Sequence, residues 1–179
     1  MGGDLISRKT GRIVTRAVAF QIAFVVGHFA YDWWPSPVTA VFSGVDESVF
    51  QHMKIGFYAW IAVSAGELAA LRPSPLVGFL ASRLLGAVFA PLIFTTLWYL
   101  APAVVGPMPS DLAEILWANA TVLAAGLFIQ GLEDRLGERR LGRPLEIAAF
   151  AFALVALFLF ARFTAAPPWV DLFAPPIRP

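Results

Sequence analysis

The sequence predicts an all-α polytopic membrane protein, a bundle of five transmembrane helices. Hydrophobic residues make up 59% of its 179 residues, and the mean hydropathy is +0.73. Charged residues make up 14%, against roughly 25% in soluble domains. With no cysteine, the chain has no disulfide, thiolate nucleophile or cysteine-ligated metal. An ordinary soluble protein is therefore excluded, and residues 1–179 are expected to form a single integral membrane domain.

Five stretches are long and apolar enough to cross a bilayer, which needs about 20 helical residues. Pro91 is expected to kink the third, because proline removes a backbone donor and crowds the preceding turn. Residues 35–42 are too apolar for a free loop and too short to span, so we expect a short interfacial or re-entrant segment before the second span. Ser43 and Asp46 would then form a capping box that restarts the helix. The predicted spans cover residues 17–34, 47–71, 76–103, 110–132 and 145–164.

The distribution of basic residues predicts the orientation, because cytoplasmic loops carry the excess of Lys and Arg. The loops at 35–46 and 102–111 have none. We therefore expect an N-in/C-out protein, with its N-terminus in the cytoplasm, in a bacterial inner (plasma) membrane. No cleavage site of small residues follows the basic N-terminus, so the first span is expected to be retained. The basic residues on the predicted inner side are Arg8, Lys9, Arg12, Arg16, Arg72, Arg135, Arg139, Arg140 and Arg143.

Polar side chains gather at the predicted outer ends of the first two spans. Spacings of three and four residues place those of the first span on one helix face. The connection between the spans is short, so the two helices are expected to be antiparallel neighbours whose polar faces can meet. Such a pocket would bind or pass a small solute, a lipid headgroup or an ion. Its candidate ligand-binding residues are His28, Tyr31, Asp32, Glu47, Ser48, His52 and Lys54.

A divalent metal is a possible occupant of this pocket. Neutral imidazoles and carboxylates are first-row metal ligands, and a vacant position would hold an activated water. His28, His52 and Glu47 are the candidate ligands. The chain has no H-E-x-x-H motif and its two histidines lie on different spans. A hydrogen-bonded network that only fixes helix packing therefore stays open, with Lys54 extending to the headgroups. No other cofactor is expected.

A structural ion pair is predicted at the inner side. Glu67 lies near the inner end of the second span and Arg83 two turns into the third, across a short turn. Pairing would partly offset both desolvation costs, and a proton or ion relay is the alternative. Helices are expected to pack through small residues. These are Gly27, Gly56, Gly66, Gly86 and Gly126.

Nucleic-acid binding is not expected. Acids nearly cancel bases in the loop 133–140, and no stacking aromatic residues interleave them. Three functions remain open. The first is the outward-facing pocket for a solute, headgroup or ion; the second is a metal-assisted membrane hydrolase acting on a lipid-borne bond. The third is a structural accessory subunit of a larger membrane complex, with a membrane protein partner or a homo-oligomer.

The central polar segment resembles a family motif. Residues 46–54, Asp-Glu-Ser-Val-Phe-Gln-His-Met-Lys, are similar to an N/D-E-S-V-W/F-x-H-x-K motif, and His28, Tyr31, Glu67 and the Pro-Pro-Trp at 167–169 extend the likeness. The family is an uncharacterised one of small multi-pass bacterial membrane proteins, a domain of unknown function. Gln51 stands where the family has Glu, and Trp169 where it has His. The resemblance implies an outer polar site covered by the C-terminal tail, and no activity.

Overall fold

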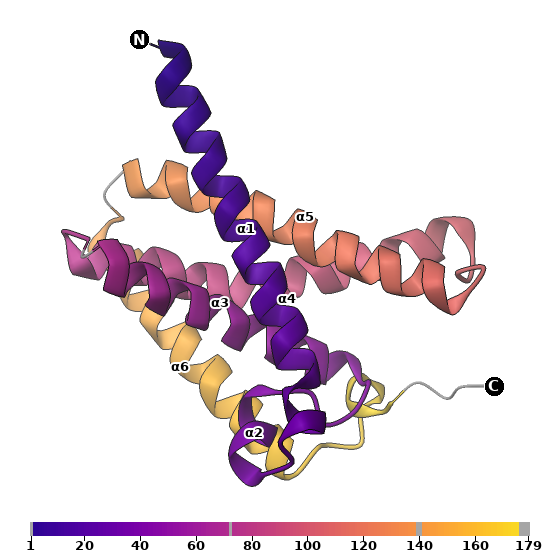
Figure 1. Cartoon of the computed structure of the whole chain (residues 1–179). Helices are drawn as coiled ribbons and strands as arrows, with labels where there is room; N and C mark the ends of the chain where they lie inside the picture. Colours follow the sequence, from indigo (N-terminus) through magenta and orange to yellow (C-terminus); the bar gives the residue numbers. More distant parts are fainter. Residues whose placement is uncertain (1, 72, 139–140, 176–179) are drawn as a thin grey trace.

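The computed structural model describes residues 2–71, 73–138 and 141–175, and these residues are helical with no strand. Arg72, Arg139 and Arg140, which entered the orientation argument, lie outside them. Figure 1 shows the order of the elements. They are α1 (Gly2–Trp33), α2 (Pro37–Phe42), α3 (Val49–Leu71), α4 (Leu76–Val105), α5 (Asp111–Glu138), α6 (Arg143–Ala165) and the short 3-10 helix η1 (Asp171–Phe173).

Four helices in the described part of the chain are long and apolar enough to cross a membrane. They contain Lys9–Trp33, Leu76–Val105, Asp111–Leu136 and Arg143–Ala165. The chain thus has the character of a multi-pass membrane protein. The predicted second span, α3, is outside this set because several polar and charged side chains lower its hydropathy. These are Gln51, His52, Lys54 and Glu67.

Helix boundaries differ from the sequence-based ones mainly where polar residues continue a helix beyond its apolar part. α1 begins at Gly2 and not near residue 17, and α5 continues to Glu138. The capping box expected of Ser43 and Asp46 is wrong: Ser36 and Thr39 form a capping box on α2 instead. α4 runs through Pro91 without ending.

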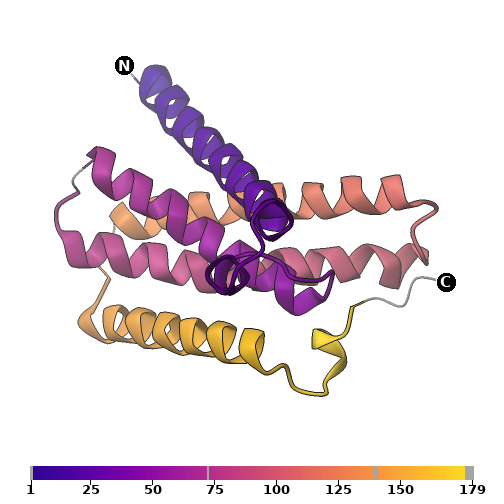
Figure 2. The ribbon, with the colours of Figure 1, turned by 60° about the horizontal axis from the view of Figure 1, so that its bottom comes forward.

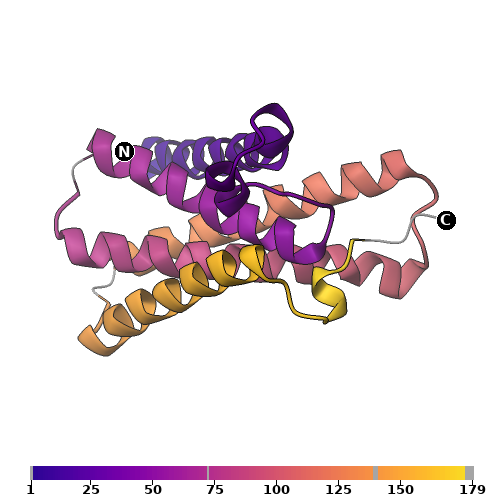
Figure 3. The same cartoon turned by 90° about the horizontal axis from the view of Figure 1, so that it is seen from below.

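α4 lies at the centre of the bundle and packs against α3, α5 and α6. These four helices run roughly side by side, as Figures 2 and 3 show. α1 crosses α3 and α5 at a steep angle, and its N-terminal end projects away from the bundle (Figure 2). α2 lies at the end of the bundle where α1 and α3 are joined (Figure 1).

Aromatic side chains fill the core between α1, α3 and α4. Phe20 meets Trp60 edge-on at 4.8 Å between ring centroids, and Phe24 meets Phe94 edge-on at 5.5 Å. All four are buried. Such edge-to-face pairs contribute about 0.5–1.5 kcal/mol each beyond burial of their area. The crossing point of α1 is thereby fixed against α3.

Two glycines let α3 and α4 approach closely. A Cβ on Gly56 would lie 2.5 Å from Phe94 Cε1, and one on Gly86 would lie 2.5 Å from Trp60 Nε1. Gly27 and Gly126 also face side chains, at 3.0 Å. The expectation for Gly66 is wrong, because nothing lies within 4 Å of its Cβ position.

Candidate functional site

The segment between α2 and α3 is anchored on α1 by one serine. Ser43 is fully buried; its Oγ donates to Gly27 O over 2.5 Å and accepts from Tyr31 N over 2.9 Å. Those two backbone groups are four residues apart, the spacing of a helical hydrogen bond. The Ser43 hydroxyl therefore lies against the α1 backbone beside His28. This contact holds the residues that follow Ser43, among them Glu47, close to the His28 imidazole.

The start of α3 is organised by the next polar residues. Asp46 Oδ1 accepts from Ser48 N over 2.8 Å. Ser48 is buried, and its carbonyl accepts from the backbone N–H groups of Gln51 and His52, at 3.1 and 3.3 Å. Its hydroxyl lies 3.4 Å from Gln51 N. Ser48 thus starts the helix, and Glu47 is left outside it, facing α1.

Three potential ligands converge where α1 and the start of α3 meet. Glu47 Oε1 lies 3.6 Å from His28 Nε2, and Glu47 Oε2 lies 3.6 Å from His52 Nε2. The centroids of the two imidazole rings are 5.2 Å apart. One ligand atom from each residue can be chosen so that all lie within 4.8 Å of one another. The predicted trio His28, Glu47 and His52 is therefore brought together, in a position that is mostly exposed to solvent.

The hydrogen bonding leaves these nitrogens available. At 3.6 Å neither imidazole makes a hydrogen bond to Glu47. His52 Nδ1 lies 2.9 Å from Ser48 O, a carbonyl that only accepts, so Nδ1 carries the hydrogen in the neutral ring and Nε2 carries the lone pair. Histidine ligands of metals commonly donate their other N–H to a carbonyl in this way. The Nε2 nitrogens of both histidines thus face Glu47 without a hydrogen bond to it.

The remaining predicted ligands do not join the trio. Lys54 is 0% exposed and donates to Ala40 O over 2.6 Å and to Thr164 Oγ1 over 3.1 Å. The expectation that it extends to the headgroups is wrong: it ties α2, α3 and α6 together. Tyr31 contributes its backbone N–H to Ser43, and Asp32 is exposed one turn beyond His28.

A second polar cluster lies at the other end of the bundle. The expected pair is present, with Arg83 Nε 3.1 Å from Glu67 Oε2. Both residues belong to a larger, mostly buried network of three arginines and three carboxylates, in which Arg12 alone is exposed. Arg16 pairs with Glu67, Glu133 and Asp134; Arg83 also pairs with Glu133; Arg12 pairs with Asp134; and Trp60 Nε1 donates to Glu133 Oε1 over 3.1 Å.

Most of this network was not anticipated from the sequence. From the sequence, Arg16 indicates only the orientation, and Glu133 and Asp134 only belong to a loop whose acids nearly cancel its bases. A signal was present: Arg16 precedes Phe20, Phe24 and His28 at intervals of four, which places it on the buried face of α1. The three positive charges of the network equal its three negative charges. We therefore interpret it as a structural ion network that holds α1, α3, α4 and α5 together.

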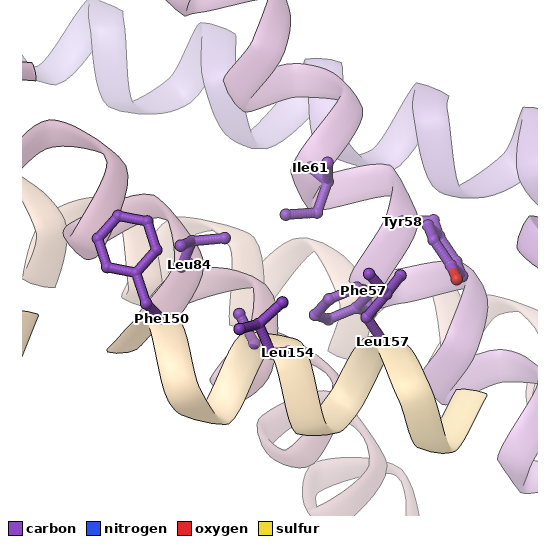
Figure 4. A pocket seen from close by; sticks show the side chains of 8 residues that line it. Phe57, Tyr58, Ile61, Leu84, Phe150, Leu154 and Leu157 are labelled. Atoms are coloured by element: carbon purple, nitrogen blue, oxygen red, sulfur yellow. The ribbon is translucent and has the colours of Figure 1, made fainter. Parts of the chain in front are cut away.

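The two cavities near the bundle surface are apolar and lie away from the trio. Figure 4 shows the smaller, of about 180 Å³, between α3, α4 and α6, lined by residues such as Phe57 and Leu154. The larger, of about 230 Å³, lies beneath η1 and is lined by Phe50 and Phe173 among others. No residue of the trio lines either cavity.

The described part of the tail does not cover the trio. Phe173 packs on Phe50 at 4.5 Å and on Phe163 at 5.2 Å between ring centroids. Two positions along an α-helix are rotated by about 200°, so Phe50 and His52 lie on opposite sides of α3. The tail covers an apolar side of α3, and the trio is left open.

No family model, curated protein or solved structure matches the chain.

Proposed function

We propose that this chain is a membrane protein that binds a divalent metal ion of the zinc class at its outer face, through His28, Glu47 and His52. The observation that carries the proposal is the convergence of two imidazole nitrogens on one carboxylate at 3.6 Å. Two nitrogen donors and one oxygen donor suit zinc, copper or nickel ions better than Mg²⁺ or Ca²⁺, which prefer oxygen.

The spacing of the trio is close to that of a loaded site. Zinc bonds of about 2.0–2.1 Å place tetrahedral ligand atoms about 3.4 Å apart. Each 3.6 Å contact uses a different oxygen of Glu47, and with one ligand atom from each residue all three atoms lie within 4.8 Å of one another. The Glu47 side chain is 50% exposed, so its carboxylate has room to turn towards either imidazole without moving a helix.

We further propose that α3 is a fifth span, which makes the protein N-in/C-out in a bacterial inner membrane. Its 23 residues reach about 35 Å as a helix, enough for a hydrocarbon core of about 30 Å. Its polar side chains need not face lipid, since Gln51 and Lys54 are buried in the bundle. Arg12, Arg16 and Arg135 lie at the end opposite to the trio, as the positive-inside rule requires of the cytoplasmic side.

The test is a calorimetric titration, in which Zn²⁺ is added to chelator-stripped protein in detergent and the heat of binding is measured. The chain has two histidines, so a tag without histidine leaves the trio as the sole source of imidazole. Wild type is expected to bind one equivalent, and His28→Ala, His52→Ala and Glu47→Gln each to bind at least about tenfold more weakly. Asp111→Asn, a change in an exposed acid at the start of α5, is the control.

The pH dependence has a definite sign. A protonated imidazole nitrogen does not bind a metal. Zinc affinity is therefore expected to fall as the pH is lowered from 8 to 5.5. Binding by wild type that is no tighter than binding by the double variant His28→Ala/His52→Ala would show that the trio is not a metal site.

A metal-assisted hydrolase is the second candidate. The solvent-exposed side of Glu47 leaves room for a water next to the metal, and zinc lowers the pKa of such a water to about 7. Zinc-dependent cleavage of an activated ester by wild type, absent from His52→Ala, would support this role. A protein that binds zinc in the calorimeter but gives the same ester cleavage as His52→Ala is a binding protein only.

A further inference from the structure

A pair of carboxamides joins α1 to α5 at membrane depth. Gln21 Nε2 donates to Asn119 Oδ1 over 2.7 Å, and Asn119 Nδ2 donates to Ile115 O over 2.8 Å. Gln21 lies inside the candidate span Lys9–Trp33, five residues beyond Arg16. Asn119 lies inside the candidate span Asp111–Leu136. An amide pair at this depth lies within the hydrocarbon of a bilayer.

The pair is not enclosed by the bundle. Asn119 is exposed, and the bond between the two amides lies at the protein surface. The side chains around it are large, apolar and exposed, as expected of a surface in contact with lipid tails. Those neighbours are Val18 and Ile22 on α1, and Ile115 and Leu116 on α5.

The amides keep hydrogen-bonding capacity that lipid tails cannot satisfy. A carboxamide has two N–H donors and one carbonyl acceptor. Each of the two amides uses one N–H in the contacts above, so each keeps one N–H. Gln21 Oε1 is buried and has no hydrogen-bond partner, whereas Asn119 Oδ1 accepts one hydrogen bond and has a second lone pair. Unsatisfied polar groups in hydrocarbon are costly, and amide side chains are used across membrane helix interfaces for this reason.

We propose that the Gln21–Asn119 surface is a homodimer interface in the membrane, with a second copy of this chain as its partner. The exposed Asn119 offers both a spare N–H and a second lone pair on Oδ1, so the patch is complementary to its own two-fold copy. Ala120 and Ala124 are exposed on the same helix, and small residues allow helix backbones to come close. The proposal depends on the chain spanning the membrane and does not depend on the metal site.

The first test is the oligomeric state of full-length protein in liposomes, by single-molecule photobleaching over a series of dilutions and with a chelator present. Wild type is expected to dimerise reversibly. Gln21→Leu/Asn119→Leu is expected to lower the association constant at least tenfold. The swapped variant Gln21→Asn/Asn119→Gln keeps both amides and is expected to dimerise. Monomeric wild type, or equal association by the leucine variant, overturns the proposal.

A second readout does not depend on removing the amides. The chain lacks cysteine, so Ile22→Cys, at a position 60% exposed beside Gln21, can be cross-linked by a short membrane-permeable bifunctional thiol reagent. Leu154→Cys, at a position 66% exposed on α6, is the matched control on the other side of the bundle from α1 (Figure 2). At least tenfold more cross-linked dimer is expected from Ile22→Cys, and equal yields overturn the proposal even if the leucine variant does not fold.

Discussion

Removing one carboxylate from the buried ion network should destabilise the protein strongly. The Glu133 side chain is 2% exposed. It forms ion pairs with Arg16 and Arg83 and accepts a hydrogen bond from the Trp60 indole. Glu133→Gln leaves two buried guanidinium groups with one negative charge fewer between them. Breaking a buried ion pair in this way costs about 3–5 kcal/mol. Because glutamine still accepts from the indole, we expect the lower value, about 3 kcal/mol.

That loss can be measured by thermal unfolding in mild detergent, followed by circular dichroism. For a chain of this length about 1 kcal/mol corresponds to roughly 2–4 °C, so a fall in Tm of about 6–12 °C is expected. Glu114→Gln makes the same change at an exposed acid in the first turn of α5, and is expected to change Tm by less than about 3 °C. Equal Tm values for the two variants would show that the network does not form.

Two further predictions concern close packing and the positioning of Glu47. Gly86→Ala places a methyl group against Glu133 and Trp60, so about 1–3 kcal/mol of stability should be lost in the same unfolding assay. Gly66→Ala, in open space, should lose almost none; similar losses in the two variants would refute the packing geometry. Ser43→Ala removes the anchor that holds Glu47 beside α1, and should weaken zinc binding about 10–100-fold by calorimetry. Zinc binding as tight as in wild type would show that the anchor is not needed.

The sequence predicted the helical class and the polar trio because both follow from local patterns. Apolar runs of about 20 residues identify helices, and the short connection at 35–42 makes His28 and His52 neighbours. The pairing of Glu67 with Arg83 followed from a short turn in the same way. Each of these inferences uses residues that are near in sequence or joined by a tight connection.

The contacts that the sequence did not predict depend on how helices distant in the chain pack together. The partners Arg16 and Glu133 are 117 residues apart, and only the steep packing of α1 on α5 brings them together. Lys54 was expected at the surface because charged side chains are usually exposed. In the structure α2 covers it, and the carbonyl of Ala40 accepts a hydrogen bond from its amine. Two of the polar residues that lower the hydropathy of α3, Gln51 and Lys54, are likewise buried by neighbouring helices.

X-ray absorption at the zinc edge tests the proposed metal site most directly, because it counts the ligands. Zinc-loaded wild-type protein is expected to show two imidazole nitrogens at about 2.0–2.1 Å together with oxygen ligands. His52→Ala, loaded at a higher zinc concentration, is expected to show one. A shell made only of oxygen atoms in wild type would contradict a site formed by His28, Glu47 and His52.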